Sequence, residues 1–166
     1  MSIKFNILYL DDEESNLRIF RTAFKRYYKV YTASLVDKAF EILESNDIHL
    51  IISDQRMPQM TGVEFLTKTR VKYPDVGRMI LTGFSDVKAI IDAINDGGVH
   101  RYITKPWEIG TLKEILDEAC EQYQMQESKK DFVRSLQTDN EKLLAQVKSL
   151  QDKLSNKDTS KYHGVS

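Results

Sequence analysis

Several short apolar runs of this chain end in polar residues that could together bind a cation and a small oxyanion. The candidates are Asp11, Asp12 and Glu13 after the run 7–10, Asp54 after 50–53, Thr82 after 79–81, and Lys105 after 101–104. If these runs are neighbouring parallel strands, their carboxyl ends meet at one edge of a sheet. That edge would gather three or four carboxylates, a hydroxyl and an ammonium group. We therefore expect a site for a divalent cation and an oxyanion there.

The charges of this cluster need compensation. Two carboxylates about 5 Å apart repel each other by roughly 3 kcal/mol at an effective dielectric constant of 20. Lys105 could offset one charge, and Mg²⁺, which prefers oxygen ligands, could offset the others. A carboxylate beside such an ion can attack phosphorus and form an aspartyl phosphate. The Thr82 hydroxyl and the Lys105 ammonium group would then bind the remaining phosphoryl oxygens.

The elements that carry these residues alternate along the first two-thirds of the chain. Short β-branched runs predict strands near 4–10, 29–33, 48–53, 78–82 and 101–104. Apolar residues at helical spacing predict helices between them, over about 17–27, 39–43, 63–71 and 87–94. Strand–helix alternation at this spacing predicts an α/β fold, with a doubly wound parallel sheet covered by helices on both faces.

The overall composition limits the class of protein. The 166 residues are 41% hydrophobic and carry a net charge of −1, which argues against binding nucleic acid by bulk electrostatics. A single cysteine, Cys120, excludes an internal disulfide. Neither a signal peptide nor an apolar run of about 18–20 residues is present, so no membrane contact is expected. We expect a soluble cytoplasmic protein. The three histidines show no metal-binding spacing, and no role is assigned to them.

The composition changes after Gly110. Glycine and proline are absent between Thr111 and His163, which predicts one long helix, or two with an unmarked join. A heptad repeat predicts a parallel coiled coil over 133–154, although a helix that folds back on its own domain is an alternative. Its seam consists of Val133, Leu136, Asn140, Leu143, Val147, Leu150 and Leu154. The expected organisation is a domain over 1–122, a helical extension over 123–158 and a disordered tail over 159–166.

Four motifs, in order along residues 3–122, resemble the receiver domain of two-component response regulators. They are Leu10-Asp11-Asp12-Glu13, Asp54-Gln55-Arg56-Met57-Pro58-Gln59-Met60-Thr61-Gly62, Leu81-Thr82-Gly83 and Tyr102-Ile103-Thr104-Lys105-Pro106. Each motif alone is weak, but four in this order, each after a strand, are highly specific. The resemblance implies a flavodoxin-like, five-stranded parallel sheet of order 2-1-3-4-5, followed by a long C-terminal helix.

The resemblance also implies a metal site and a phosphoacceptor. Asp54 would accept the phosphoryl group. Asp12, Asp54 and the backbone carbonyl of Arg56 would bind Mg²⁺ directly, and Asp11 would act through water. Lys105 would pair with Asp54 or its phosphate.

Two further residues resemble the conformational switch of the family. Thr82 would bind the phosphoryl group and move toward it, and Tyr102 would turn inward as Thr82 moves. An ordinary core role for Tyr102 is the alternative. The Lys105–Pro106 peptide bond is expected to be cis, as in the family.

The function expected from these residues is that of a response regulator. A histidine kinase or phosphotransfer protein would donate the phosphoryl group, and the output would be protein contact or coiled-coil homodimerisation. No enzymatic activity is expected beyond self-catalysed phosphorylation and dephosphorylation. A phosphatase or phosphotransferase that uses Asp54 as its nucleophile is a rival interpretation. Haloacid-dehalogenase enzymes of that kind carry a second carboxylate two residues after the nucleophile, where this chain has Arg56, so no turnover is expected. Two alternatives stay open: a constitutive coiled-coil scaffold, or the N-terminal part of a larger regulator whose output domain is absent.

Overall fold

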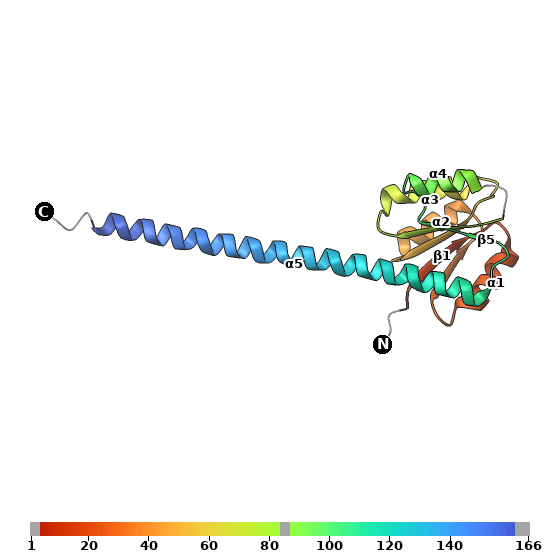
Figure 1. Cartoon of the computed structure of the whole chain (residues 1–166), viewed down its shortest axis with the longest axis horizontal. Coiled ribbons are helices and arrows are strands. Elements are labelled where there is room, and N and C mark those ends of the chain that lie inside the picture. Colours follow the sequence, from red (N-terminus) through yellow and green to blue (C-terminus); the bar gives the residue numbers. More distant parts are fainter. Residues whose placement is uncertain (1–3, 84–86, 162–166) are drawn as a thin grey trace. The chain divides into compact units, whose positions relative to one another are not determined.

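A five-stranded parallel sheet forms the centre of the protein (Figure 1). The computed structural model describes residues 4–83 and 87–161, and for 158–161 the backbone alone. The strands are β1 (Asn6–Leu10), β2 (Lys29–Ala33), β3 (Leu50–Asp54), β4 (Gly77–Thr82) and β5 (Arg101–Thr104). They lie in the order β2-β1-β3-β4-β5. The predicted doubly wound fold and its strand order are therefore confirmed.

Helices cover both faces of the sheet (Figure 1). The five described helices are α1 (Glu14–Phe24), α2 (Val36–Ser45), α3 (Gly62–Lys72), α4 (Val87–Asn95) and α5 (Ile109–Lys161). Helices α2, α3 and α4 bury their apolar residues in a cluster on one face. Helix α1 and the first turns of α5 do so on the other face. Each crossover carries the chain from the carboxyl edge of the sheet back to its amino edge, so all five strands end at the same carboxyl edge.

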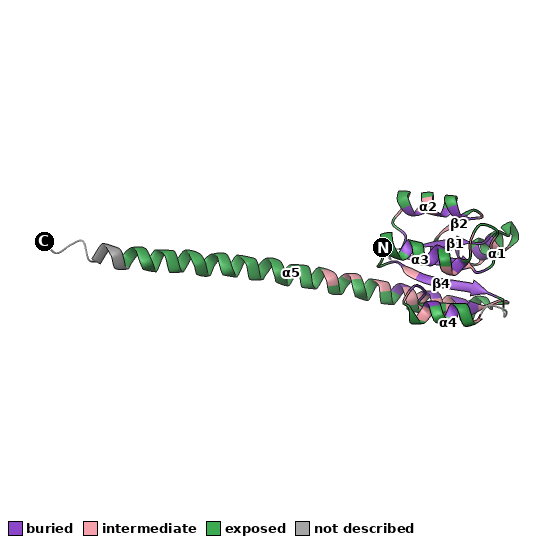
Figure 2. Ribbon diagram, turned by 90° about the horizontal axis from the view of Figure 1, so that it is seen from above, coloured by how far each residue is buried: buried purple, intermediate pink, exposed green. Residues whose placement is uncertain are grey.

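The three central strands, β1, β3 and β4, are buried on both faces, which explains their nearly continuous apolar sequences, whereas the edge strands β2 and β5 are partly exposed (Figure 2). Two residues of the predicted apolar helix faces are nevertheless exposed. Val71 in α3 is 86% exposed and Ile91 in α4 is 44% exposed. In α3 the buried positions include Phe65 and Leu66, and Val71 lies roughly 140° around the helix from Leu66. Its apolar character therefore does not reflect burial.

The chain divides into two compact units, residues 1–123 and 124–166. Helix α5 is one continuous helix that contributes to both units, which decides between the one or two helices expected after Gly110. The boundaries predicted at 122, 133 and 154 stay predictions. Residues 162–166 of the predicted tail lie outside the described residues. Among the helices described, none is both long enough and apolar enough to cross a membrane.

Two histidines, to which the sequence assigned no role, tie neighbouring strands together at the amino edge of the sheet. The ring Nδ1 of His49 accepts a hydrogen bond of 2.8 Å from the backbone N–H of Asn6, and the backbone N–H of His49 donates to the Asn6 carbonyl at 3.0 Å. His100 repeats the arrangement with Arg78, at 3.1 and 2.8 Å. In each pair the ring Nδ1 accepts from the backbone N–H of the preceding neighbour strand, so both histidines add a side-chain hydrogen bond between strands. His163 lies outside the described residues.

The His100 arrangement predicts a pH-dependent stability. Partial burial of the ring and the nearby Arg78 and Arg70 lower the pKa of His100. The unfolded chain therefore binds this proton near the ordinary histidine pKa of about 6.5, and the folded chain only at lower pH. The His100 contribution is complete above that value and is lost as the pH falls toward the folded pKa. We expect the urea-unfolding free energy to fall less between pH 7 and pH 5.5 in His100→Gln than in the unmodified chain. An identical decline in both proteins would contradict this assignment.

Candidate functional site

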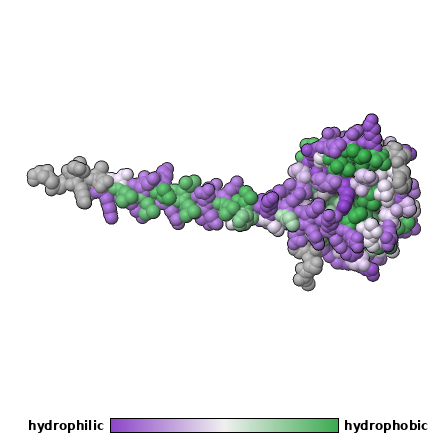
Figure 3. Space-filling view, in the orientation of Figure 1, coloured by the Kyte–Doolittle hydropathy of each residue, from purple (hydrophilic) through white to green (hydrophobic). Residues whose placement is uncertain are grey.

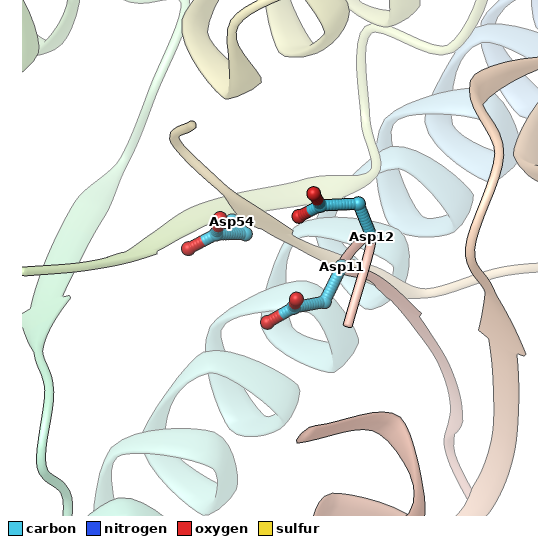
Figure 4. Close-up of side chains that lie close together, drawn as sticks. All are labelled: Asp11, Asp12 and Asp54. Carbon is cyan, nitrogen blue, oxygen red and sulfur yellow. The ribbon is translucent and has the colours of Figure 1, made fainter. Parts of the chain in front are cut away.

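Three carboxylates meet at the carboxyl edge of the sheet, as the sequence predicted. Asp11 and Asp12 follow β1 directly, and Asp54 is the last residue of β3. One carboxylate oxygen from each lies within 4.8 Å of one from each of the others. Asp11 is buried, Asp54 is half-buried and Asp12 is exposed, and the three side chains point into a common space (Figure 4). The cluster is therefore open to solvent on the Asp12 side.

Lys105 joins two of these carboxylates. Its Nζ donates to Asp54 Oδ1 at 2.8 Å and to Asp11 Oδ2 at 2.9 Å. Burial alone would lower the pKa of Lys105, but the hydrogen bonds to the two carboxylates outweigh it and raise that pKa. Burial raises the pKa of Asp54, and Lys105 offsets this only in part. The site thus holds a charged lysine between two carboxylates, and burial still makes ionisation of Asp54 less favourable than in water. The Lys105–Pro106 bond is cis, as expected.

Asp11 has further partners that the sequence analysis did not identify. The Tyr9 hydroxyl donates to Asp11 Oδ2 at 2.5 Å, and Asn16 Nδ2 donates to the same oxygen at 3.0 Å. The backbone N–H of Glu13 donates to Asp11 Oδ1 at 3.0 Å. Burial and the bond to Asp11 raise the pKa of Tyr9. A signal was present in the sequence, because residues two apart on a strand share a face and a tyrosine two residues before Asp11 can reach it.

The loop after Asp54 is held by the start of α3. The backbone N–H of Gly62 donates to the Gln55 carbonyl at 3.0 Å, and Val63 N–H donates to Gln55 Oε1 at 3.1 Å. A Cβ atom on Gly62 would lie 2.3 Å from the Asp54 carbonyl oxygen, so only glycine permits this approach. Thr61 and Glu64 cap the helix reciprocally. Arg56 lies in this loop, exposed, two residues after Asp54.

The two predicted switch residues lie on β4 and β5. Thr82, the last residue of β4, is 2% exposed, and its hydroxyl donates to the Gly83 carbonyl at 3.0 Å. The hydroxyl is thus engaged locally and does not bond to Asp54. Tyr102 is half-buried and packs against the cluster beneath α2, α3 and α4, and it also lines a surface cavity of about 490 Å³ with Trp107. Its two predicted alternatives, a switch or a core residue, both fit this position.

The predicted coiled-coil seam lies in the second unit. Its apolar members are Val133, Leu136, Leu143, Val147, Leu150 and Leu154, each between 48% and 66% exposed in the single chain. Phe132 and Leu144 add exposed apolar surface beside it. Figure 3 shows apolar side chains recurring along this part of α5. Asn140 is exposed within the seam. An apolar stripe of this length on a helix is typical of a surface that another chain covers.

Comparisons with known proteins agree with this geometry. The family model of the response regulator receiver domain matches residues 7–117. The hydrogenase transcriptional regulatory protein HoxA of Bradyrhizobium diazoefficiens is 38% identical over 126 residues, which cover 76% of this chain and 26% of HoxA. A chemotaxis protein CheY homolog of Campylobacter jejuni is 32% identical over 117 residues, which cover 68% of this chain and 89% of the homolog.

A solved structure extends the comparison to three dimensions. The signal receiver domain of an HD domain-containing protein from Pseudomonas fluorescens superposes with a TM-score of 0.71 and 31% identity, over 77% of this chain and 95% of that domain. The chain belongs to the response regulator receiver domain family. Phosphoryl acceptance is the general function of receiver domains, which generally bind Mg²⁺ at an acidic pocket. The chain spans about a quarter of the length of HoxA, 26%.

The double contact of Lys105 predicts a stability effect without metal. In Lys105→Met, the carboxylates of Asp11 and Asp54 would face each other without the cation. We expect the free energy of unfolding to fall by about 3 kcal/mol in the presence of a chelator. Adding Asp54→Asn should restore part of the loss, because it removes one of the two repelling charges. Urea unfolding of the single and double variants measures both effects, and an additive loss in the double variant would contradict the expected coupling.

Proposed function

We propose that this chain is a phosphorylatable receiver in which Asp54 accepts a phosphoryl group from a histidine kinase or phosphotransfer protein. The observation that carries the proposal is the meeting of Asp11, Asp12 and Asp54 within 4.8 Å of one another, with Lys105 between two of them. Membership of the receiver family supports it. In the reaction, an Asp54 oxygen attacks phosphorus, and the bond from phosphorus to the nitrogen of the donor histidine breaks.

The donor set of the site fits Mg²⁺. All three candidate side chains offer carboxylate oxygens, which suit a hard divalent cation, and Lys105 neutralises only one negative charge of the three. Asp12 and Asp54, with the Arg56 carbonyl, would hold the ion directly, and Asp11 would act through water. When bound, the ion would supply positive charge beside the carboxylates and the phosphoryl oxygens.

Lys105 and Thr82 act on the phosphoryl group in this proposal. Lys105, already 2.8 Å from Asp54 Oδ1, would bind a phosphoryl oxygen after transfer. The Thr82 hydroxyl would exchange its bond to the Gly83 carbonyl for one to the phosphoryl group. Because Thr82 is buried, this exchange would require the end of β4 to shift. Tyr102 lies on β5, which pairs with β4, so a shift of β4 would change the space available to the Tyr102 ring. Tyr102 would turn inward as a consequence.

Phosphorylation of Asp54 is tested by mass. Incubation with Mg²⁺ and acetyl phosphate should add about 80 Da, the mass of one phosphoryl group. Asp54→Asn should abolish the gain because an amide is not a nucleophile of this kind. Asp47→Asn is a matched control, since the Asp47 side chain is 84% exposed and lies on the loop before β3. An equal gain in Asp54→Asn and the unmodified chain would overturn the assignment.

Outside its own phosphorylation and dephosphorylation, we propose that the chain is not an enzyme. A turnover assay with small phosphate esters tests this, and sustained product release would contradict it. We propose a cytoplasmic location, where soluble phosphodonors are available. The HoxA relative is a transcriptional regulatory protein of which this chain matches 26%. That proportion favours, as a second candidate, a receiver within a larger regulator.

We further propose that the second unit forms a parallel homodimeric coiled coil through the 133–154 seam. The exposure of all six apolar seam residues supports it, because their burial in a partner would be favourable. Asn140 at an a position would fix the parallel register. The adjoining e and g positions carry few complementary charges, so the register would depend on the seam itself. A fold-back helix and a coil that binds a different protein are the competing assignments.

The dimer is tested with charges placed on and off the seam. Leu143→Asp/Leu150→Asp should yield monomers in sedimentation equilibrium, because buried unpaired carboxylates oppose association. Ser135→Asp/Ser149→Asp adds the same charges at c positions and should leave the dimer intact. If the unmodified chain is monomeric at high concentration, the seam must be assigned to fold-back or to another partner. Equal weakening by both pairs of substitutions would also contradict the seam.

A further inference from the structure

The Asp11 carboxylate accepts hydrogen bonds from four different donors. Its Oδ2 accepts from Lys105 Nζ at 2.9 Å, Tyr9 Oη at 2.5 Å and Asn16 Nδ2 at 3.0 Å. Its Oδ1 accepts from the Glu13 N–H at 3.0 Å. Lys105 belongs to the receiver motifs, whereas Tyr9 and Asn16 do not. These two side chains need an explanation of their own.

Both donors are fixed by the elements that carry them. Tyr9 is 1% exposed, and its ring centroid lies 4.7 Å from that of Phe20, so packing restricts where the hydroxyl can lie. Asn16 lies in the first turn of α1, whose Leu17 and Phe20 are buried against the same face of the sheet. The donors therefore approach Asp11 from two packed elements, β1 and α1, and do not depend on a loop.

Tyr9 and Asn16 bind the same Asp11 oxygen as Lys105. Lys105 Nζ lies 2.9 Å from Asp11 Oδ2 and 2.8 Å from Asp54 Oδ1, so its position would change when an ion or a phosphoryl group competes for these carboxylates, whereas Tyr9 and Asn16 contact Asp11 alone among the three carboxylates of the described site. Tyr9 and Asn16 bind the same oxygen and restrict its rotation, while Glu13 N–H holds the other oxygen. Groups that orient a carboxylate near an ion in this way commonly affect metal affinity, because the water through which Asp11 would act then meets a carboxylate that is already in place.

We propose that Tyr9 and Asn16 are positioning residues that hold the Asp11 carboxylate in its Mg²⁺-competent orientation. They thereby set the Mg²⁺ affinity of the site. The inference rests on the proposed function, since it concerns the same metal. It assigns no contact with the phosphoryl group to either residue. Both act through Asp11.

The chain contains a matched control for Tyr9. Tyr28 is 4% exposed, lies in the same hydrophobic cluster, and donates its hydroxyl to a carboxylate, that of Asp117 in α5. Tyr28→Phe removes the same atom and the same kind of bond outside the site. Tyr9→Phe and Tyr28→Phe should both be less stable. Only Tyr9→Phe should change the binding of Mg²⁺.

The test is calorimetric titration of the full chain with MgCl₂. Tyr9→Phe should raise the dissociation constant about threefold to tenfold, and tenfold corresponds to about 1.4 kcal/mol, comparable to one net hydrogen bond. Tyr28→Phe should stay within about twofold of the unmodified chain, since that change is only a few tenths of a kcal/mol. Asn16→Ala, which leaves the core intact, should weaken binding in the same direction if Tyr9→Phe proves too unstable to titrate.

A second measurement separates positioning from a general loss of structure. The Mg²⁺ dependence of acetyl phosphate labelling, followed by intact mass, should shift its midpoint in Tyr9→Phe. The rate at saturating Mg²⁺ should stay that of the unmodified chain. Unchanged or tighter Mg²⁺ binding in both Tyr9→Phe and Asn16→Ala would overturn the inference, as would equal weakening in Tyr28→Phe. Failure of the unmodified chain to bind Mg²⁺ or take phosphate would instead overturn the proposed function.

Discussion

The repulsion among three carboxylates is the constraint on which the rest of the site depends. Asp11, Asp12 and Asp54 lie within 4.8 Å of one another because the ends of two paired strands, β1 and β3, meet at one edge of a parallel sheet. Ionised together in a partly buried place, they would oppose folding by several kcal/mol. The metal-free chain limits this cost through Lys105, which contacts two of them. A bound cation and a phosphoryl group would each alter this balance of charge, which is the physical basis of the proposed response of the site to both.

The surrounding fold keeps these charges in place. The strand ends are fixed by a sheet whose central strands are largely buried, so the backbones that carry the carboxylates cannot move apart without disrupting the core. Gly62 lets α3 approach the Asp54 carbonyl, and Gln55 ties the intervening loop to the start of that helix. Tyr9 and Asn16 donate hydrogen bonds to Asp11 from β1 and α1. Repulsion within the site is therefore balanced by packing outside it.

Helix α5 meets two different environments along its length. Leu112, Leu116 and Cys120 pack against the sheet in the first unit, and Tyr123 lies 5.0 Å from the His49 ring. From residue 124 onward the helix belongs to a second unit with an exposed apolar stripe. The run 121–131 between these parts is mostly polar and contributes little packing. One helix thus combines a part that the domain stabilises with a part that a partner would stabilise.

The sequence by itself determined where the strands end and which residues stand there. Asp11, Asp12, Asp54, Thr82 and Lys105 could be placed at one edge because strand–helix alternation and four ordered motifs predict the parallel sheet. The absence of glycine and proline between Thr111 and His163 also predicted the long helix after Gly110. Such features depend on neighbouring residues, so they are visible in a linear pattern.

Only the tertiary structure decided which groups satisfy one another across elements. The Asn16 bond to Asp11 depends on how α1 packs against β1, and the His49 and His100 bonds depend on the register between adjacent strands. Whether an apolar helix residue such as Val71 is buried depends on which face of α3 packs on the sheet, and that face is the one with Phe65, Leu66 and Thr69. Strand register and the packed face of a helix both depend on side chains that are distant in sequence.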